Sequence, residues 1–297
     1  MTDPIRIGTR ASPLARAQTE RFVRRLRAVA PSRAIEITTL VTSGDRTRGT
    51  GRPLDFTGAL AEALRARAID LAVHSAKDLP AGDPPDLPIV AYPARADPRD
   101  AVVARRWPLP PRATLGTSSV RRQAQWARAR PDLRLVPIRG NVDTRLAMVR
   151  RGRVDAVVLA RAGMERLGRA DEITATLPLA SFVPAPGQGI LAVQGRAGDR
   201  ALRAIVRRCD DPATRACATI ERSITARLGG DCDVPLGVVA RRSSGRTTVR
   251  AEVLSLDGRR AVRLRYATSE NSPARIAAHV AARLTRMGAL ELLPRLP

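Results

Sequence analysis

The stretch that decides the fold reads Ile69-Asp70-Leu71-Ala72-Val73-His74-Ser75-Ala76-Lys77-Asp78-Leu79-Pro80. Its first half is an apolar run that predicts a buried strand, and its second half is a polar cluster that a proline ends. Open α/β sheets bind ligands at the carboxyl ends of their strands. The stretch therefore predicts a strand of an α/β sheet with a ligand site at its carboxyl end.

Lys77 is the only lysine in a chain whose other long basic side chains are all arginine. Its presence beside Asp78 favours a site that needs a compact ammonium group rather than a planar guanidinium. The alternative is a lysine kept by chance on a solvated turn, and this residue alone does not separate the two readings.

Outward from this stretch, strands alternate with helices, which predicts parallel sheets. A strand at 5–8 leads to Ser12 and Pro13, the residue types that cap and begin a helix, and the helix should run to about Val29. Two short echoes indicate that this unit occurs twice: Ile7–Ser12 resembles Leu115–Ser119, and Ile69–Val73 resembles Val154–Val158. Two similar domains would leave a cleft between them, a preferred place for a ligand.

The segment Pro184–Gly189 should cross between the two domains, and a strand at 190–193 should rejoin the first. From about Asp211 the pattern changes to a helix, three strand-like runs and a last helix, which predicts an α+β domain on an antiparallel sheet. The domains are therefore expected at 1–94 with 188–208, at 95–187 and at 209–297.

The amino-acid composition favours some classes of binding partner and disfavours others. The chain of 297 residues has a formal charge of +24, but its arginines are scattered and aromatic residues make up only 2%. Nucleic acid is therefore disfavoured as a partner, and a polycarboxylate small molecule suits the charge better. Three cysteines and two histidines without metal-type spacing predict no metal site. With no signal-like segment or long apolar run, we expect a cytoplasmic protein that does not bind membranes.

Three predicted helix or turn N-termini carry basic and hydroxyl residues: Thr9–Ser12, Thr117–Arg122 and Arg139–Arg145. Free backbone N–H groups and forked arginines there favour bound anions, although each segment alone is also an ordinary helix cap. Asp78, beside so much positive charge, should stay ionised and could stabilise a cation or move a proton. A simple pairing with Lys77 is the alternative.

Cys232 lies in the tight loop Gly229–Pro235 between two aspartates, which disfavour a thiolate. A thiol that captures an electrophile once, as a permanent tether, remains possible, and a loop cysteine with no role is the usual case. Cys209 and Cys217 fall in or near a helical segment and are expected to be packing residues.

The whole chain, from about residue 4, resembles the hydroxymethylbilane synthase (porphobilinogen deaminase) family. Six motifs in the right order carry the resemblance, and they are Ile7–Ala15, Ala72–Pro80, Gly116–Gln123, Arg139–Arg145, Pro186–Gly189 and the Cys232 loop. The resemblance implies two similar hinged α/β domains, periplasmic-binding-protein type II-like, plus a C-terminal α+β domain with an antiparallel sheet. It also implies a monomer.

The family is a transferase of tetrapyrrole (porphyrin and haem) biosynthesis, which joins four porphobilinogens head to tail with loss of ammonia. Its growing polypyrrole chain is built on a dipyrromethane cofactor held by a thioether, which by resemblance falls on Cys232. The catalytic aspartate matches Asp78, with Lys77 and Phe56 as further catalytic candidates. By the same resemblance, the residues that hold cofactor and substrate carboxylates are Arg10, Ser12, Ser75, Lys77, Thr117, Ser119, Arg121, Arg122, Arg139, Arg145, Arg166 and Gln188.

One region departs from the family pattern. The family usually has a Lys-Gly-x-Phe stretch before the Asp78 strand, whereas the loop 46–56 is shorter here and has no lysine. Phe56 matches the aromatic residue, and Arg48 or Arg52 is a candidate to replace the lysine. The departure keeps two alternatives open: a homologue impaired in catalysis and a two-domain anion-binding protein.

Overall fold

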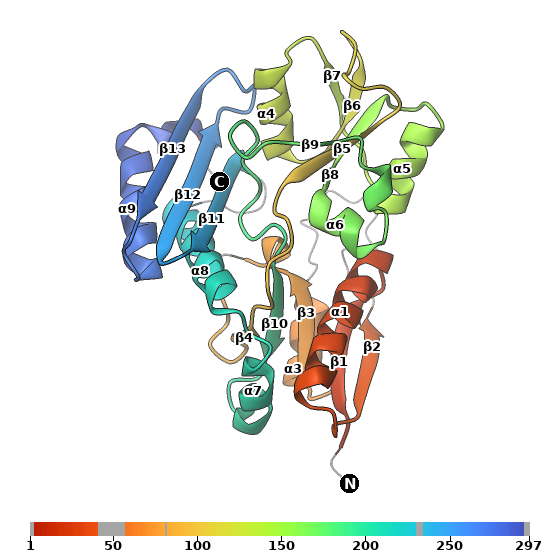
Figure 1. Ribbon diagram of the computed structural model, residues 1–297, viewed down its shortest axis with the longest axis vertical. Helices are drawn as coiled ribbons and strands as arrows, with labels where there is room; N and C mark the ends of the chain where they lie inside the picture. The colour runs from red at the N-terminus through yellow and green to blue at the C-terminus, as the bar shows by residue number, and fades with distance from the viewer. Residues whose placement is uncertain (1–2, 41–56, 81, 230–233, 294–297) are drawn as a thin grey trace. The chain divides into compact units, whose positions relative to one another are not determined.

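The computed structural model describes residues 3–40, 57–80, 82–229 and 234–293. Contacts within the chain divide it into two compact units. The first unit combines Met1–Arg95 with Ile190–Arg215, and the second combines Ala96–Gly189 with Ala216–Pro297. Figure 1 labels the elements of both units along the chain.

The sheet of the first unit has the strand order β2-β1-β3-β10-β4 in the described part of the chain. Strands β1 (Ile5–Arg10), β2 (Ile35–Leu40) and β3 (Leu71–Ser75) are parallel to one another. Strand β10 (Leu191–Gly195) runs antiparallel between β3 and β4 (Ile89–Ala91). The sheet therefore uses a strand from far along the chain, after a long excursion into the second unit.

Helix α1 (Pro13–Val29) begins where the sequence predicts, with Ser12 accepting a hydrogen bond from the backbone N–H of Ala15. Its apolar face packs on β1 and β3, while α3 (Gly58–Arg65) packs near the start of β3. The sequence does not predict α7 (Arg200–Arg207), in which arginines surround a short apolar face.

The sheet of the second unit repeats the first order as β7-β6-β8-β5-β9. Its parallel strands, β6 (Thr114–Gly116), β7 (Arg134–Val136) and β8 (Ala156–Ala160), hold the same places as β1, β2 and β3. Strand β5 (Asp100–Ala104) is antiparallel to β8 and also pairs with β9 (Ala175–Thr176). The repeated order confirms two similar α/β domains.

The expectation of purely parallel sheets is wrong for β5 and β10. Both strands directly follow a segment that crosses between the units, so no helical crossover precedes them. The rule that ties alternating strands and helices to parallel pairing applies only to strands joined by such a crossover. Each sheet is therefore mixed, with an antiparallel strand in its fourth position.

The second unit also contains the helices α4 (Val120–Ala129), α5 (Val142–Arg150) and α6 (Arg161–Arg166), each of which follows a parallel strand or its loop. Asn141 caps α5 by accepting a hydrogen bond from the backbone N–H of Thr144 at 2.9 Å. Short 3₁₀ turns follow β3, α6 and α9, and they are η1 (Ala76–Asp78), η2 (Ala170–Glu172) and η3 (Ala289–Leu292).

The C-terminal region is the predicted α+β domain. Strands β11 (Leu236–Ser243), β12 (Arg246–Leu254) and β13 (Ala261–Thr268) form an antiparallel sheet, as Figure 1 shows in blue. Helices α8 (Pro212–Arg227) and α9 (Pro273–Arg286) supply the rest of its aliphatic core. No helix in the described ranges combines the length and apolar character that a membrane span requires.

Candidate functional site

In the first unit, the carboxyl ends of β1 and β3 lie at one edge of the sheet, because Ile7 pairs with Leu71 in a parallel register. Arg10 ends β1, Ser75 ends β3, and the turn η1 follows directly. This topology gathers the predicted residues of the unit at one edge, and they are Arg10, Ser12, Ser75, Lys77 and Asp78. The structure therefore places these residues at one sheet edge of the first unit, and their roles stay a prediction.

The Asp78 carboxylate is accessible. It is partly exposed, and no residue in the described ranges forms a hydrogen bond or ion pair with it. Lys77, on the same turn, does have an interaction of its own. A carboxylate with no partner among the described residues is well suited to meet a positive charge that a ligand brings.

Two residues of the first unit were not predicted as part of the site. Gln18, buried on α1, donates a hydrogen bond from Nε2 to Ser75 Oγ at 2.9 Å and fixes that hydroxyl. The signal for it is a polar residue in the middle of the apolar face of α1. His74 is buried, and its pKa is lowered to about 4, mainly by burial, with the charge of Arg10 acting in the same direction and a hydrogen bond with Gln194 opposing both. The imidazole is therefore neutral near pH 7.

In the second unit, three loops follow the carboxyl ends of β6, β7 and β8 at the corresponding edge. Thr117 Oγ1 accepts a hydrogen bond from the backbone N–H of Ser119 at 3.2 Å. Ser118 Oγ donates to the carbonyl oxygen of Ile138 at 2.6 Å and joins the loops after β6 and β7. The remaining predicted residues of this edge are Arg139, Arg145 and Arg166.

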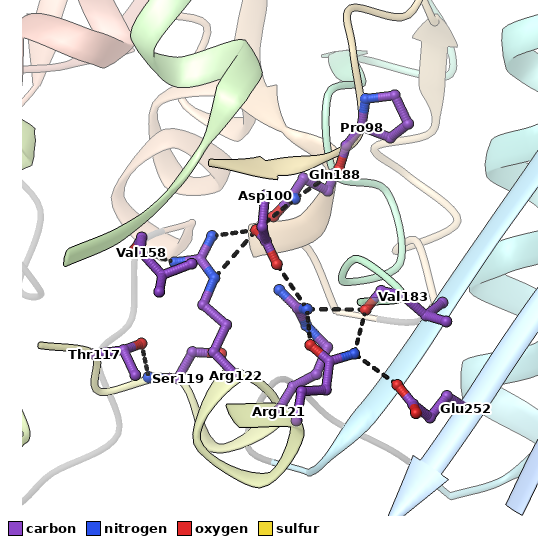
Figure 2. Close-up of polar contacts among 11 residues, drawn as sticks. Pro98, Asp100, Thr117, Ser119, Arg121, Arg122, Val158, Val183, Gln188 and Glu252 are labelled. Atoms are coloured by element: carbon purple, nitrogen blue, oxygen red, sulfur yellow. Dashed lines mark hydrogen bonds and ion pairs between the residues drawn. The ribbon is translucent and has the colours of Figure 1, made fainter. Parts of the chain in front are cut away.

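Arg121 and Arg122, in the first turn of α4, are not exposed forks: they are 4% and 6% exposed. Figure 2 shows both guanidinium groups pointing at the carboxylate of Asp100. Arg121 Nη1 donates to Asp100 Oδ2 at 2.9 Å, and Arg122 Nη2 donates to Asp100 Oδ1 at 2.7 Å. Burial alone would raise the pKa of Asp100, but the two arginines outweigh it and hold that pKa far below its usual value.

Arg121 also connects the site to the C-terminal sheet. Its Nη1 donates to Gln125 Oε1 at 2.8 Å, and Gln125 Nε2 donates to Glu252 Oε2 on β12 at 2.7 Å. Arg263 pairs with the same glutamate. Through these hydrogen bonds, Arg121 helps to join the second α/β domain to the C-terminal sheet within one compact unit.

Gln188 lies in this network rather than at an open surface. Its Nε2 donates to Asp100 Oδ1 at 2.9 Å and to the carbonyl oxygen of Pro98 at 2.7 Å (Figure 2). Arg166 Nη2 donates to the carbonyl oxygen of Gly189 at 2.6 Å. Gln188 and Arg166 therefore contact the two segments by which the chain first enters this unit, near Pro98, and then leaves it, at Gly189.

The charge of these two edges fits a ligand with several carboxylates. Arginines and one lysine outnumber the acids Asp78 and Asp100 among the residues gathered there. Burial, and then the nearby charge of Arg122, lower the pKa of Arg145, so two guanidinium groups lie close enough to repel each other. A bound anion relieves such repulsion, and this donor set fits the acid side chains of a dipyrromethane.

Phe56 and Cys232 lie outside the described residues, as do Arg48, Arg52 and all of the loop 46–56. Cys209 and Cys217 are buried in the hydrophobic cores, as predicted for packing residues. Burial raises the pKa of Cys209, which makes this thiol a poor nucleophile. Both cysteines are buried, so neither is suited to carry a group that must be accessible to a ligand.

Comparison with known proteins gives the family. The model of the porphobilinogen deaminase dipyromethane cofactor binding domain matches residues 5–204, and that of the porphobilinogen deaminase C-terminal domain matches residues 215–286. The porphobilinogen deaminase of Roseiflexus castenholzii is 43% identical over 99% of this chain and 99% of its own length. Those of Mycobacterium avium and Desulforudis audaxviator are each 42% identical over 97% of this chain and 96% of their own lengths.

These matches cover nearly the whole chain, and they agree with the six sequence motifs and the repeated sheet order. They confirm the resemblance stated from the sequence, including the transferase class and the dipyrromethane cofactor. The chain belongs to the porphobilinogen deaminase family.

Proposed function

We propose that this chain joins four porphobilinogen molecules head to tail, with release of ammonia, and makes the linear tetrapyrrole of haem and porphyrin biosynthesis. The observation that carries this proposal is the carboxylate of Asp78, which no described residue pairs with, at a sheet edge otherwise rich in basic and hydroxyl groups. A polycarboxylate substrate that becomes cationic needs both features.

Asp78 is assigned the catalytic role. When ammonia leaves porphobilinogen, positive charge remains on the substrate ring, and an ionised carboxylate beside it lowers the energy of that state. Lys77, on the same turn, places an ammonium group where substrate carboxylates arrive. Phe56 is proposed as the aromatic residue that covers the ring, by its match to the family motif.

The cofactor is proposed to be attached through Cys232, and it supplies the terminal pyrrole to which the first substrate is joined. The residues proposed to hold cofactor and substrate carboxylates are Arg10, Ser12, Ser75, Lys77, Thr117, Ser119, Arg122, Arg139, Arg145 and Arg166. For Arg121 and Gln188 the hydrogen bonds above favour a supporting part in the same site.

The domain boundaries, the partners and the compartment are part of the proposal. We propose domains at 1–94 with 188–208, at 95–187 and at 209–297, which keep each sheet within one domain. The partners are porphobilinogen and the growing polypyrrole chain, with no nucleic acid and no membrane. The protein is proposed to act in the cytoplasm as a monomer.

Turnover of porphobilinogen tests the function. Purified protein should release one ammonia for each porphobilinogen consumed and form a linear tetrapyrrole. A protein that carries the cofactor but releases no ammonia would be the impaired homologue that the lysine-free loop leaves open. A protein without cofactor that binds porphobilinogen reversibly would be a two-domain anion-binding protein, and either result would contradict the proposal.

A further inference from the structure

Asp100 occupies a special place in the second sheet. It is the first residue of β5, and because β5 runs antiparallel to β8, Asp100 pairs with Ala160 at the carboxyl end of that strand. A strand that runs the other way thus brings an acid to the edge where the parallel strands place their ligand-binding loops. The side chain is fully buried.

The Asp100 carboxylate holds Arg122 from one side. Asp100 Oδ1 accepts hydrogen bonds from Arg122 Nε at 3.2 Å and from Arg122 Nη2 at 2.7 Å. The carbonyl oxygen of Val158 accepts a third from Arg122 Nη1 at 2.9 Å. A guanidinium with both edges engaged in this way keeps one orientation.

Arg122 retains N–H groups that can donate further hydrogen bonds. A guanidinium has five N–H groups, and three are used, so one remains on each terminal nitrogen with no acceptor among the described residues. Arg145 lies close enough to Arg122 for the two charges to interact. Two donors on a fixed, buried cation beside a second cation form a seat for a carboxylate.

We propose that Asp100 is a positioning residue: it fixes the Arg122 guanidinium so that the remaining N–H groups hold a carboxylate of the bound pyrrole chain. The inference rests on the proposed function and adds to it a residue that touches neither substrate nor cofactor. Gln188 supports Asp100 by donating to the same oxygen that receives Arg122.

Asp100→Asn separates three roles. If Asp100 acted only through its charge, the variant would be one unit more positive and would bind porphobilinogen more tightly. If it acted only on folding, the thermal midpoint would fall and the KM would stay unchanged. A positioning role predicts a KM for porphobilinogen about tenfold higher in folded protein, the size of one lost charge-assisted contact.

Asp70→Asn is the matched control. Asp70 also accepts hydrogen bonds from two arginines, Arg6 and Arg196, but it lies before β3, at the other end of the strand from Asp78. This variant should lose stability and keep the wild-type KM. An Asp100→Asn protein that is folded but cannot retain dipyrromethane shows the same loss in a stronger form. Wild-type or lower KM in folded, loaded Asp100→Asn protein would overturn the inference.

A double-mutant cycle with Arg122→Lys identifies the residue through which Asp100 acts. Lysine keeps the charge but loses the fork, so it should raise the KM by itself, and adding Asp100→Asn should then change little. Additive effects would overturn the assignment. If Asp100→Asn does not fold, Asp100→Glu keeps the charge and shifts the carboxylate by one methylene, and a wild-type KM in that variant would overturn it equally.

Different results would contradict the proposed function and the positioning role of Asp100. If wild-type protein neither carries dipyrromethane nor consumes porphobilinogen, the proposed function falls and this inference falls with it. If wild-type protein is active and only the KM prediction for Asp100 fails, the function stands and the positioning role alone is wrong.

Discussion

The two α/β domains share a sheet order, yet each places a different kind of aspartate at its ligand edge. In the first, Asp78 is partly exposed on the turn η1, and no described residue forms a hydrogen bond or ion pair with it. In the second, Asp100 is buried and accepts hydrogen bonds from two arginines and a glutamine. The first carboxylate is accessible to a ligand, whereas the second is engaged by the protein, and the proposed catalytic and holding roles depend on this difference.

Asp78→Ala should give the largest effect on activity. Loss of the carboxylate should slow ammonia release by about 10²–10³-fold, the range for removing one electrostatic group that acts on the transition state. The free energy of unfolding should change by less than about 0.5 kcal/mol, because the carboxylate has no described partner to lose. Steady-state ammonia release and chemical denaturation measure the two quantities, and a full rate would remove Asp78 from the mechanism.

Asp100→Asn should lose far more folding stability than Asp78→Ala. Removing one partner of a buried ion pair leaves uncompensated charge on Arg121 and Arg122, which costs about 3 kcal/mol. Chemical denaturation of Asp100→Asn and Asp78→Ala, measured side by side, checks the contrast. Equal free energies of unfolding for the two variants would contradict the described difference between Asp100, which is buried and hydrogen-bonded, and Asp78, which is not.

The dependence of folding stability on pH should differ between His74, in the first domain, and Asp100, in the second. The pKa of His74 is lowered to about 4 in the folded state, so the unfolded chain binds more protons below pH 6.5. Stability is therefore fully present above about pH 6.5 and is lost as the pH falls toward 4, by up to about 3 kcal/mol. The pKa of Asp100 is lowered from 3.8, so its contribution persists until the pH falls below about that value.

His74→Gln tests this assignment, because the amide does not titrate in that range. The variant should lose less stability between pH 7 and pH 4 than wild-type protein, as measured by urea denaturation at a series of pH values. Identical slopes in the two proteins would show that His74 titrates normally in the folded state.

The smallest of these effects concerns the helix caps. Asn141 accepts hydrogen bonds from the backbone N–H and the hydroxyl of Thr144, both at 2.9 Å, and Asn141→Ala should cost about 1 kcal/mol. Ser12 caps α1 in the first domain with one hydrogen bond, at 3.3 Å, so Ser12→Ala should cost no more. Thermal unfolding of both variants compares the caps, and a larger loss for Ser12→Ala would reverse the order.

Most of the fold was predictable, because its signals are local. Ser12 and Pro13 mark the start of α1, and the echo between Ile69–Val73 and Val154–Val158 reflects the equivalent strands β3 and β8. The antiparallel strands were not predictable in this way. Their direction depends on where the chain re-enters each sheet, and no short pattern in the sequence records that route.

The same limit explains what was missed in the site. Asp100 precedes an apolar run, and in a purely parallel sheet the start of a strand lies at the edge opposite the ligand. The antiparallel direction of β5 reverses that conclusion and brings Asp100 to Arg121 and Arg122. Those two arginines were expected to bind anions, and the sequence gives their chemistry but not their burial.

The intact mass of the purified protein tests the central claim most directly. After supply with porphobilinogen, the wild-type chain and the Cys209→Ser and Cys217→Ser variants should each be heavier than the sequence by two linked pyrroles. Cys232→Ser should have the mass of the bare polypeptide. A wild-type chain with no added mass, or an adduct that persists in Cys232→Ser, would contradict the account.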